Sequence, residues 1–80
     1  MPRSQRSLHV LLKTAAVFEL LDRLDLSQNE LARRCGISRG YMTRLMRGER
    51  SPSPRLRRRM QEVLGVDDFH VLFFIVEEDG

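Results

Sequence analysis

The sequence predicts a small, mainly α-helical domain of four or five helices, with a short two-stranded ribbon joining its N- and C-terminal segments. The length of 80 residues suits one compact domain. A hydrophobic content of 41% and a charged content of 31% are those of a chain that folds. In the centre, apolar residues recur every three or four positions between Ser and Gly residues that mark helix starts and ends. We expect a basic arm over 1–7 and a single domain over 8–80, with its helical core at 14–66.

The first elements lie on either side of residue 13. Residues 8–13 are too few for their periodicity to decide between a strand and an extension of the next helix. A helix over about 14–24 is indicated by apolar residues on one face, namely Val17, Phe18, Leu20, Leu21 and Leu24.

Two short helices follow, separated by a tight turn. Ser27 and Glu30 form a capping-box pattern, so a helix is expected to begin at Gln28 and to end at Gly36. Ser38 then caps a second helix that closes near Gly48. The apolar residues of the second helix are Tyr41, Met42, Leu45 and Met46.

The C-terminal third is expected to hold one more helix, a helical turn and a strand. Ser53 and Pro54 fit the cap and first position of a helix that ends at Gly65. Asp67 and Asp68 are expected to cap a helical turn leading into Phe69. The β-branched and aromatic residues that follow predict a strand at about 72–77, paired with 8–12 because a lone strand needs a partner.

The net charge of +3 conceals three unlike segments. Residues 1–32 balance four bases against four acids, and residues 60–80 carry six acids and no Lys or Arg. Residues 33–59 carry ten arginines against Glu49 alone, a net charge of +9. Since the arginine fork matches phosphates and guanine edges, a polyanionic partner is expected for this middle segment.

The sequence gives little indication of a membrane, secreted, metal-binding or catalytic protein. The longest apolar runs fall far below the roughly 20 residues of a membrane span, and no secretory cleavage pattern follows the first residues. The lone Cys35 is expected to be a small buried apolar residue, and it indicates a reducing, cytoplasmic location. His9 and His70 have no metal-ligand spacing. We therefore expect no metal, no cofactor and no catalytic activity.

The central motif resembles a known family. The segment LSQNELARRCGISRGYMTRLMRGERSPSP combines a Ser-Gln opening, a Glu-Leu-Ala core, a Gly-Ile-Ser turn and a Ser-Pro exit at fixed distances. It resembles the phage-repressor and Cro-like, or XRE-type, helix-turn-helix family over about residues 14–66. The departures are Cys35 and an arginine-rich fourth helix. The resemblance implies a lambda-repressor-like fold that binds operator DNA, commonly as a dimer.

Two sets of DNA-contacting residues are expected. On the second helix of the motif, Met42 and Leu45 point inward, so the residues expected to read bases point outward: Ser38, Arg39, Thr43, Arg44 and Arg47. Residues expected to contact phosphates are Gln28 at a helix start, Gly40, Tyr41, Arg50 and Arg55.

The leading hypothesis is a sequence-specific binder of double-stranded DNA that regulates transcription. The alternative is an antitoxin-like interaction module that grips a partner protein through its C-terminal apolar segment, Phe69 to Val76. That segment has two open interpretations, as an internal ribbon strand and as a homodimer surface. A third hypothesis is an RNA-binding or architectural protein.

Overall fold

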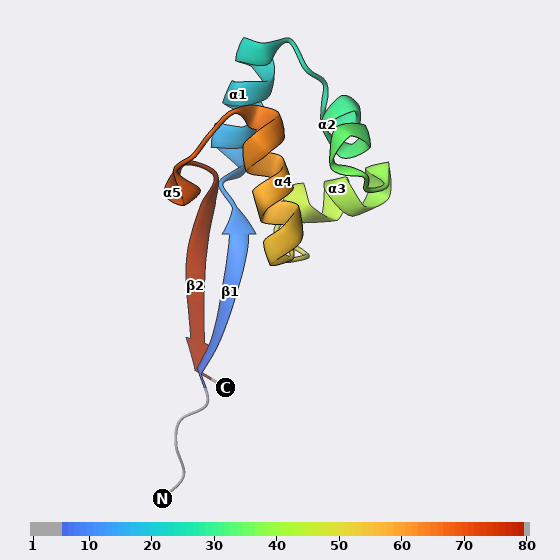
Figure 1. The fold of residues 1–80 in the computed structure, drawn as a ribbon. Helices are drawn as coiled ribbons and strands as arrows, with labels where there is room; N and C mark the ends of the chain where they lie inside the picture. The colour runs from blue at the N-terminus through green and yellow to red at the C-terminus, as the bar shows by residue number, and fades with distance from the viewer. Residues whose placement is uncertain (1–5, 80) are drawn as a thin grey trace, which may run out of the picture.

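The computed structural model describes residues 6–79, which form five helices and one antiparallel ribbon (Figure 1). The elements in chain order are β1 (Arg6–Leu12), α1 (Thr14–Leu24), α2 (Gln28–Cys35), α3 (Arg39–Met46), α4 (Pro54–Leu64), α5 (Phe69–Leu72) and β2 (Phe73–Asp79). This architecture confirms the predicted fold class. Residues 1–5 of the expected basic arm lie outside the described residues, and residues 6 and 7 belong to β1.

Helices α2, α3 and α4 start at their expected capping serines, whereas α3 ends at Met46 with Arg47, and not Gly48, as its C-cap. The side chains of Ser27, Ser38 and Ser53 each accept a hydrogen bond from the backbone amide three residues on. Gly36 ends α2 in the left-handed conformation, with φ 73°, which costs a glycine little. One detail of the capping box differs from the prediction. The Glu30 carboxylate accepts charge-assisted hydrogen bonds from Arg33 and Arg34, which are stronger than a bond to a neutral amide.

The ambiguous N-terminal segment is a strand. β1 pairs antiparallel with β2 in a register that sets Leu12 opposite Phe73 and Val10 opposite Ile75. The predicted ribbon between the two ends of the chain is therefore confirmed. The Asp68 side chain caps α5 by accepting a hydrogen bond from the His70 amide, so the apolar segment begins as a helical turn and becomes a strand at Phe73.

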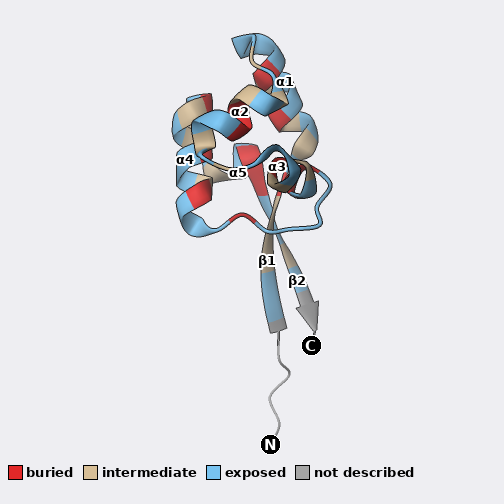
Figure 2. Ribbon diagram, turned by 90° about the vertical axis from the view of Figure 1, so that its right-hand side faces the viewer, coloured by how far each residue is buried: buried red, intermediate tan, exposed pale blue. Residues whose placement is uncertain are grey.

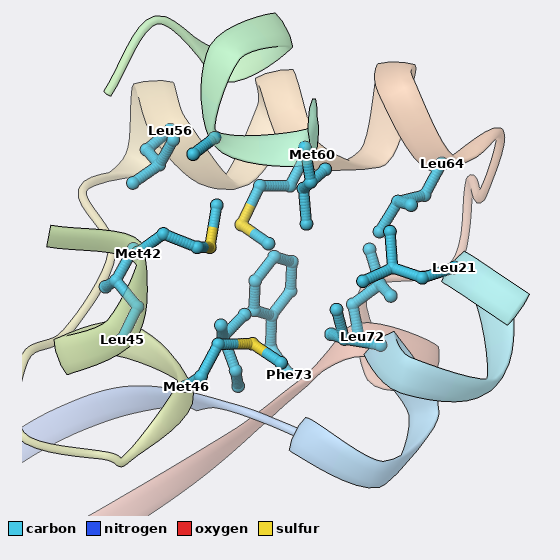
Figure 3. Packing of buried hydrophobic residues seen from close by; sticks show 13 residues of the cluster. Leu21, Met42, Leu45, Met46, Leu56, Met60, Leu64, Leu72 and Phe73 are labelled. Carbon is cyan, nitrogen blue, oxygen red and sulfur yellow. The ribbon is translucent and has the colours of Figure 1, made fainter. Parts of the chain in front are cut away.

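The core lies where the ribbon enters the helices (Figure 3). Leu12 and Phe73 are buried among side chains from α1, α3, α4 and α5. Phe73 is 0% exposed, and three methionines fill the space around it, namely Met42, Met46 and Met60. Cys35 is half-buried at the edge of this core rather than fully buried, because it ends α2 beside the chain reversal at Gly36.

Beyond its buried base, the ribbon projects away from the helices (Figures 1 and 2). Leu8 is 66% exposed and Ile75 is 52% exposed, although both are large apolar residues. The backbone amide of Lys13 donates a hydrogen bond to the carbonyl of Leu72, which holds the ribbon base against the start of α1. No helix in residues 6–79 has the length and apolar character needed to cross a membrane.

Candidate nucleic-acid interface

Helices α2 and α3 form a rigid pair joined by three residues. The amide of Ile37 donates to the carbonyl of Ala32 at 3.0 Å, which closes the end of α2. The Ser38 hydroxyl then accepts from the Tyr41 amide at 3.1 Å and starts α3. Leu31 and Ala32 of α2 are buried, and the small side chain of Ala32 allows the two helices to approach closely. These bonds fix the direction of α3 relative to α2.

One face of α3 belongs to the core and the other faces solvent. Met42, Leu45 and Met46 are buried. The five residues expected to read bases lie together on the outer side: Ser38, Arg39, Arg44 and Arg47 are exposed, and Thr43 is half-buried. The structure therefore brings the predicted set onto one surface, which we call the α3 face.

The arginines of the α3 face are largely unengaged. Among residues 6–79, neither Arg39 nor Arg44 has an ion-pair partner, and Arg47 reaches Glu49 only at 4.0 Å. An exposed pair at such a distance contributes little stability. The guanidinium groups of Arg39 and Arg44 are consequently available to an external acceptor.

Gln28 couples the start of α2 to α3. Its side-chain amide lies 3.5 Å from the Thr43 hydroxyl, which itself donates to the Arg39 carbonyl at 3.0 Å. Because the Thr43 hydroxyl is engaged within the protein, the methyl group is the part of this side chain suited to an apolar contact, such as a thymine methyl. Gln28 is half-buried at the N-terminal end of α2, beside the α3 face.

The other residues expected to contact phosphates lie at three places. Gly40 is exposed in the first turn of α3, where an added Cβ would meet nothing within 4 Å, so no internal packing requires glycine there. The half-buried Tyr41 ring lies 5.9 Å from the guanidinium of Arg50, which belongs to the α3–α4 loop. Arg55 lies apart from these, in the first turn of α4, where it lines a cavity with Cys35 and Ile37.

Electrostatics also fixes the charge of α2. Hydrogen bonds from Arg33 and Arg34 lower the pKa of the Glu30 carboxyl to about 2, so this group stays ionised near neutral pH. Burial raises the pKa of the Cys35 thiol, which favours the protonated and less reactive form. Within residues 6–79, no three His, Cys, Asp or Glu side chains gather as a metal site would require.

Helix α4 carries interactions that the sequence pattern did not reveal. The helical spacing places Arg57, Arg58 and Arg59 largely off the apolar stripe, yet Arg57 is half-buried with its guanidinium 5.7 Å from the Phe69 ring. Arg59 donates from Nε to the carbonyl of Arg34 at 3.2 Å and thereby ties α4 to the end of α2. A single-helix pattern contains no signal for either contact, since both depend on a neighbouring element.

Comparisons with known proteins agree with this geometry. A crystal structure of the transcriptional regulator VanUg is similar to this chain, with a TM-score of 0.68 and 20% sequence identity, over 98% of this chain and 99% of that one. No curated protein matches the sequence. A family model described as a helix-turn-helix domain matches residues 4–71, which include both helices of the motif and the turn between them. The chain belongs to the helix-turn-helix domain family.

Proposed function

We propose that this protein is a sequence-specific binder of double-stranded DNA that regulates transcription. The observation that carries the proposal is the α3 face, where Arg39, Thr43 and Arg44 project from a helix held firmly by α2. An α-helix fits the major groove, and arginine can bind guanine through both O6 and N7. The protein would act by binding and not by catalysis, in the cytoplasm. The Ser-Gln opening, Glu-Leu-Ala core, Gly-Ile-Ser turn and Ser-Pro exit follow one another in the order of the XRE type, which further supports this type within the family.

In this proposal, bases and phosphates are contacted by different residues. Ser38, Arg39, Thr43, Arg44 and Arg47 face the bases. The amide groups at the start of α2, with Gln28, face one phosphate, because a helix N-terminus attracts anions. The main chain at Gly40 and the side chains of Tyr41 and Arg50 would contact phosphates of the same DNA strand, and Arg55 would extend this contact from α4.

The test is a binding titration on duplex DNA. Fluorescence anisotropy is measured on a random duplex pool and on sequences selected from it, over a range of salt concentrations. About 4 to 8 phosphate contacts per bound unit would give a steep fall of log affinity with log salt. A flat salt dependence, or a selection that yields no consensus, would refute the proposal.

A pair of variants tests the division between base and phosphate contacts. Arg44→Ala should relax the preference at one base position, with a loss of about 1 to 3 kcal/mol of discrimination there. Arg50→Ala should weaken binding to all sequences alike and reduce the salt slope by about 1. If the two variants behave identically, the assignment of roles is wrong.

In addition to the DNA contact, the exposed apolar side chains of the ribbon favour a contact with another protein chain. Leu8, Phe74 and Ile75 are 66%, 39% and 52% exposed, and a ribbon has two open edges that can pair with another strand. We propose a homodimer through this ribbon, since two copies can place their α3 helices in successive major grooves. Sedimentation equilibrium should show a dimer that Ile75→Glu dissociates, whereas a monomer in both cases would contradict it.

The antitoxin-like alternative rests on the same exposed side chains. It predicts a stable complex with a second, different protein on purification from the native cell, with the segment Phe69 to Val76 protected from hydrogen exchange. The homodimer proposal predicts instead that this protection depends on the concentration of the protein itself. Hydrogen exchange at two concentrations therefore separates the two candidates.

A further inference from the structure

A second arginine-rich surface lies along α4, which packs beside α2. In Figure 2, α3 lies to the right of α4, and α2 lies above α3. Between α2 and α4 runs a cavity of about 560 Å³, which we call the α2–α4 groove; its principal lining residues are Cys35, Ile37, Arg55, Leu56, Arg58 and Arg59. A second cavity of about 580 Å³ continues it past Arg33 and Arg34 and shares Arg59 and Glu62 with it.

The cations along this groove are of two kinds. Arg33 and Arg34 bind the Glu30 carboxylate, and Arg59 lies 3.6 Å from Glu62, so these three are partly neutralised within the protein. Arg55 and Arg58 are exposed, and neither has an acidic partner among residues 6–79. The groove therefore presents unpaired positive charge beside cations that are already held in place.

The floor of the groove is apolar. Leu56 is buried, while Cys35 and Ile37 are half-buried and pack against the core from the end of α2 and the turn. Burial raises the pKa of the Cys35 thiol, so this part of the floor is uncharged. An apolar floor with a cationic rim fits a ligand that carries an apolar group and carboxylates together.

We propose that the α2–α4 groove binds an acidic, amphipathic segment of a partner protein. Carboxylates of the segment bind Arg58 and Arg59 on the rim, and an apolar side chain covers Cys35 and Ile37 on the floor. Arg55 stands at the end of the groove nearest the α3–α4 loop and is not required for this contact.

Duplex DNA is a poorer fit to the same groove. A duplex backbone presents phosphates and sugars but no apolar side chain that could cover Cys35 and Ile37. The side chains that line the groove come from α4 and its N-cap, the end of α2 and the turn after it, and none comes from α3, so we expect one duplex on α3 to leave the groove open. The proposal thus goes beyond DNA binding and adds a surface that can be occupied at the same time.

The probe for this proposal is a fluorescein-labelled synthetic peptide, EELEELLEE, added to the full chain. Binding is followed by anisotropy, and by chemical-shift changes of the backbone amides. Saturable binding below about 1 mM is expected, with shifts at Cys35, Ile37 and Arg58 and none at Thr43. The peptides QQLQQLLQQ and EESEESSEE, which lack the charge and the apolar side chains respectively, should each bind at least about fivefold more weakly.

Matched variants locate the contact on the protein. Arg58→Ala should weaken the peptide about fivefold, whereas Arg23→Ala, an exposed arginine on α1 outside the groove, should leave it unchanged. A saturating duplex should not displace the peptide. Absence of binding, or equal effects of the two variants, would overturn the proposal.

Competition by the duplex, or a reduced salt slope for DNA binding in Arg58→Ala, would likewise overturn the proposal by assigning the groove to DNA. Failure of DNA binding itself would appear instead in the duplex titration, without any change in the peptide measurements. The two proposals can therefore fail separately.

Discussion

Phe73 is the residue through which the ribbon should contribute most to stability. It is 0% exposed at the base of β2, whereas the next residue, Phe74, is 39% exposed on the opposite side of the same strand. Replacing a buried phenylalanine by alanine costs about 3 to 5 kcal/mol. A domain of this length has a total free energy of unfolding of about 4 to 12 kcal/mol, so Phe73→Ala should remove a quarter or more of it.

Phe74→Ala is the matched control, because it makes the same chemical change one residue away. With its ring only partly buried, we expect a loss of about 1 to 2 kcal/mol. The two variants should thus differ by about 1 to 4 kcal/mol. With a urea dependence of about 1 kcal/mol per M, that difference corresponds to about 1 to 4 M in the urea midpoint, measured by circular dichroism at the helix band.

A milder pair covers the case in which Phe73→Ala does not fold. Phe73→Leu should cost about 1 to 2 kcal/mol, and Phe74→Leu less than about 1 kcal/mol. Equal shifts for the two positions, or a larger shift at Phe74, would refute the reasoning. Such a result would mean that the faces of β2 are inverted or that the ribbon is not part of the core.

Three further predictions concern α2, its cap and the start of α3. Gly36→Ala should lower the free energy of unfolding by about 1 to 2 kcal/mol, because the φ of 73° is unfavourable for alanine. Gly40→Ala, at a helical position, should raise it by about 0.5 to 1 kcal/mol. Urea denaturation measures both changes, and two changes of the same sign would contradict the backbone conformations given to these glycines. The pKa of the Glu30 carboxyl is lowered from 4.5 to about 2, so the stabilising effect of this carboxylate should be complete above pH 4.5 and lost as the pH falls toward 2. A carboxyl NMR titration, with Glu30→Gln to identify the signal, measures this pKa. A titration midpoint near 4.5 would contradict the prediction. The Cys35 thiol, whose pKa is raised by burial, should react with iodoacetamide more slowly in the folded protein than in urea, and equal rates at pH 8 would show that it is not shielded.

The starts of α2, α3 and α4 and the ends of α2 and α4 were predictable because they are set by local chemistry. Ser27, Ser38 and Ser53 satisfy amides three residues away, and Gly36 and Gly65 adopt positive φ where helices end. Such signals lie within a few residues of each other in the chain. The outward set on α3 was predictable for the same reason, because helical periodicity alone separates Arg44 from Leu45.

The remaining features depend on contacts between distant segments. Residues 8–12 have no periodicity that distinguishes strand from helix, and only their pairing with β2 decides the matter. The partial burial of Arg57 depends on Phe69, twelve residues later, and the link from Arg59 to α2 depends on the carbonyl of Arg34. The α2–α4 groove was likewise invisible in the sequence, because its two walls come from different helices.

The distribution of arginine along the chain also acquires a different meaning in three dimensions. A net charge of +9 over residues 33–59 suggests one strongly cationic surface. The structure divides these side chains instead: Arg33, Arg34 and Arg59 are held by Glu30 and Glu62, and Arg57 lies against Phe69. Those that remain for an external anion fall into two groups, with Arg39, Arg44, Arg47 and Arg50 beside α3, and Arg55 and Arg58 on α4.

This division bounds the electrostatic contribution to DNA binding. If every net positive charge of the segment neutralised a phosphate, the salt slope would approach about −8 per chain, whereas the four arginines beside α3 together with Arg55 supply at most about −4.5. A slope no steeper than the smaller value would mean that the arginines of α4 beyond Arg55 are not engaged by the duplex. The cations of the α2–α4 groove then need another explanation, and the apolar side chains beside them favour a protein ligand that carries both acidic and apolar groups.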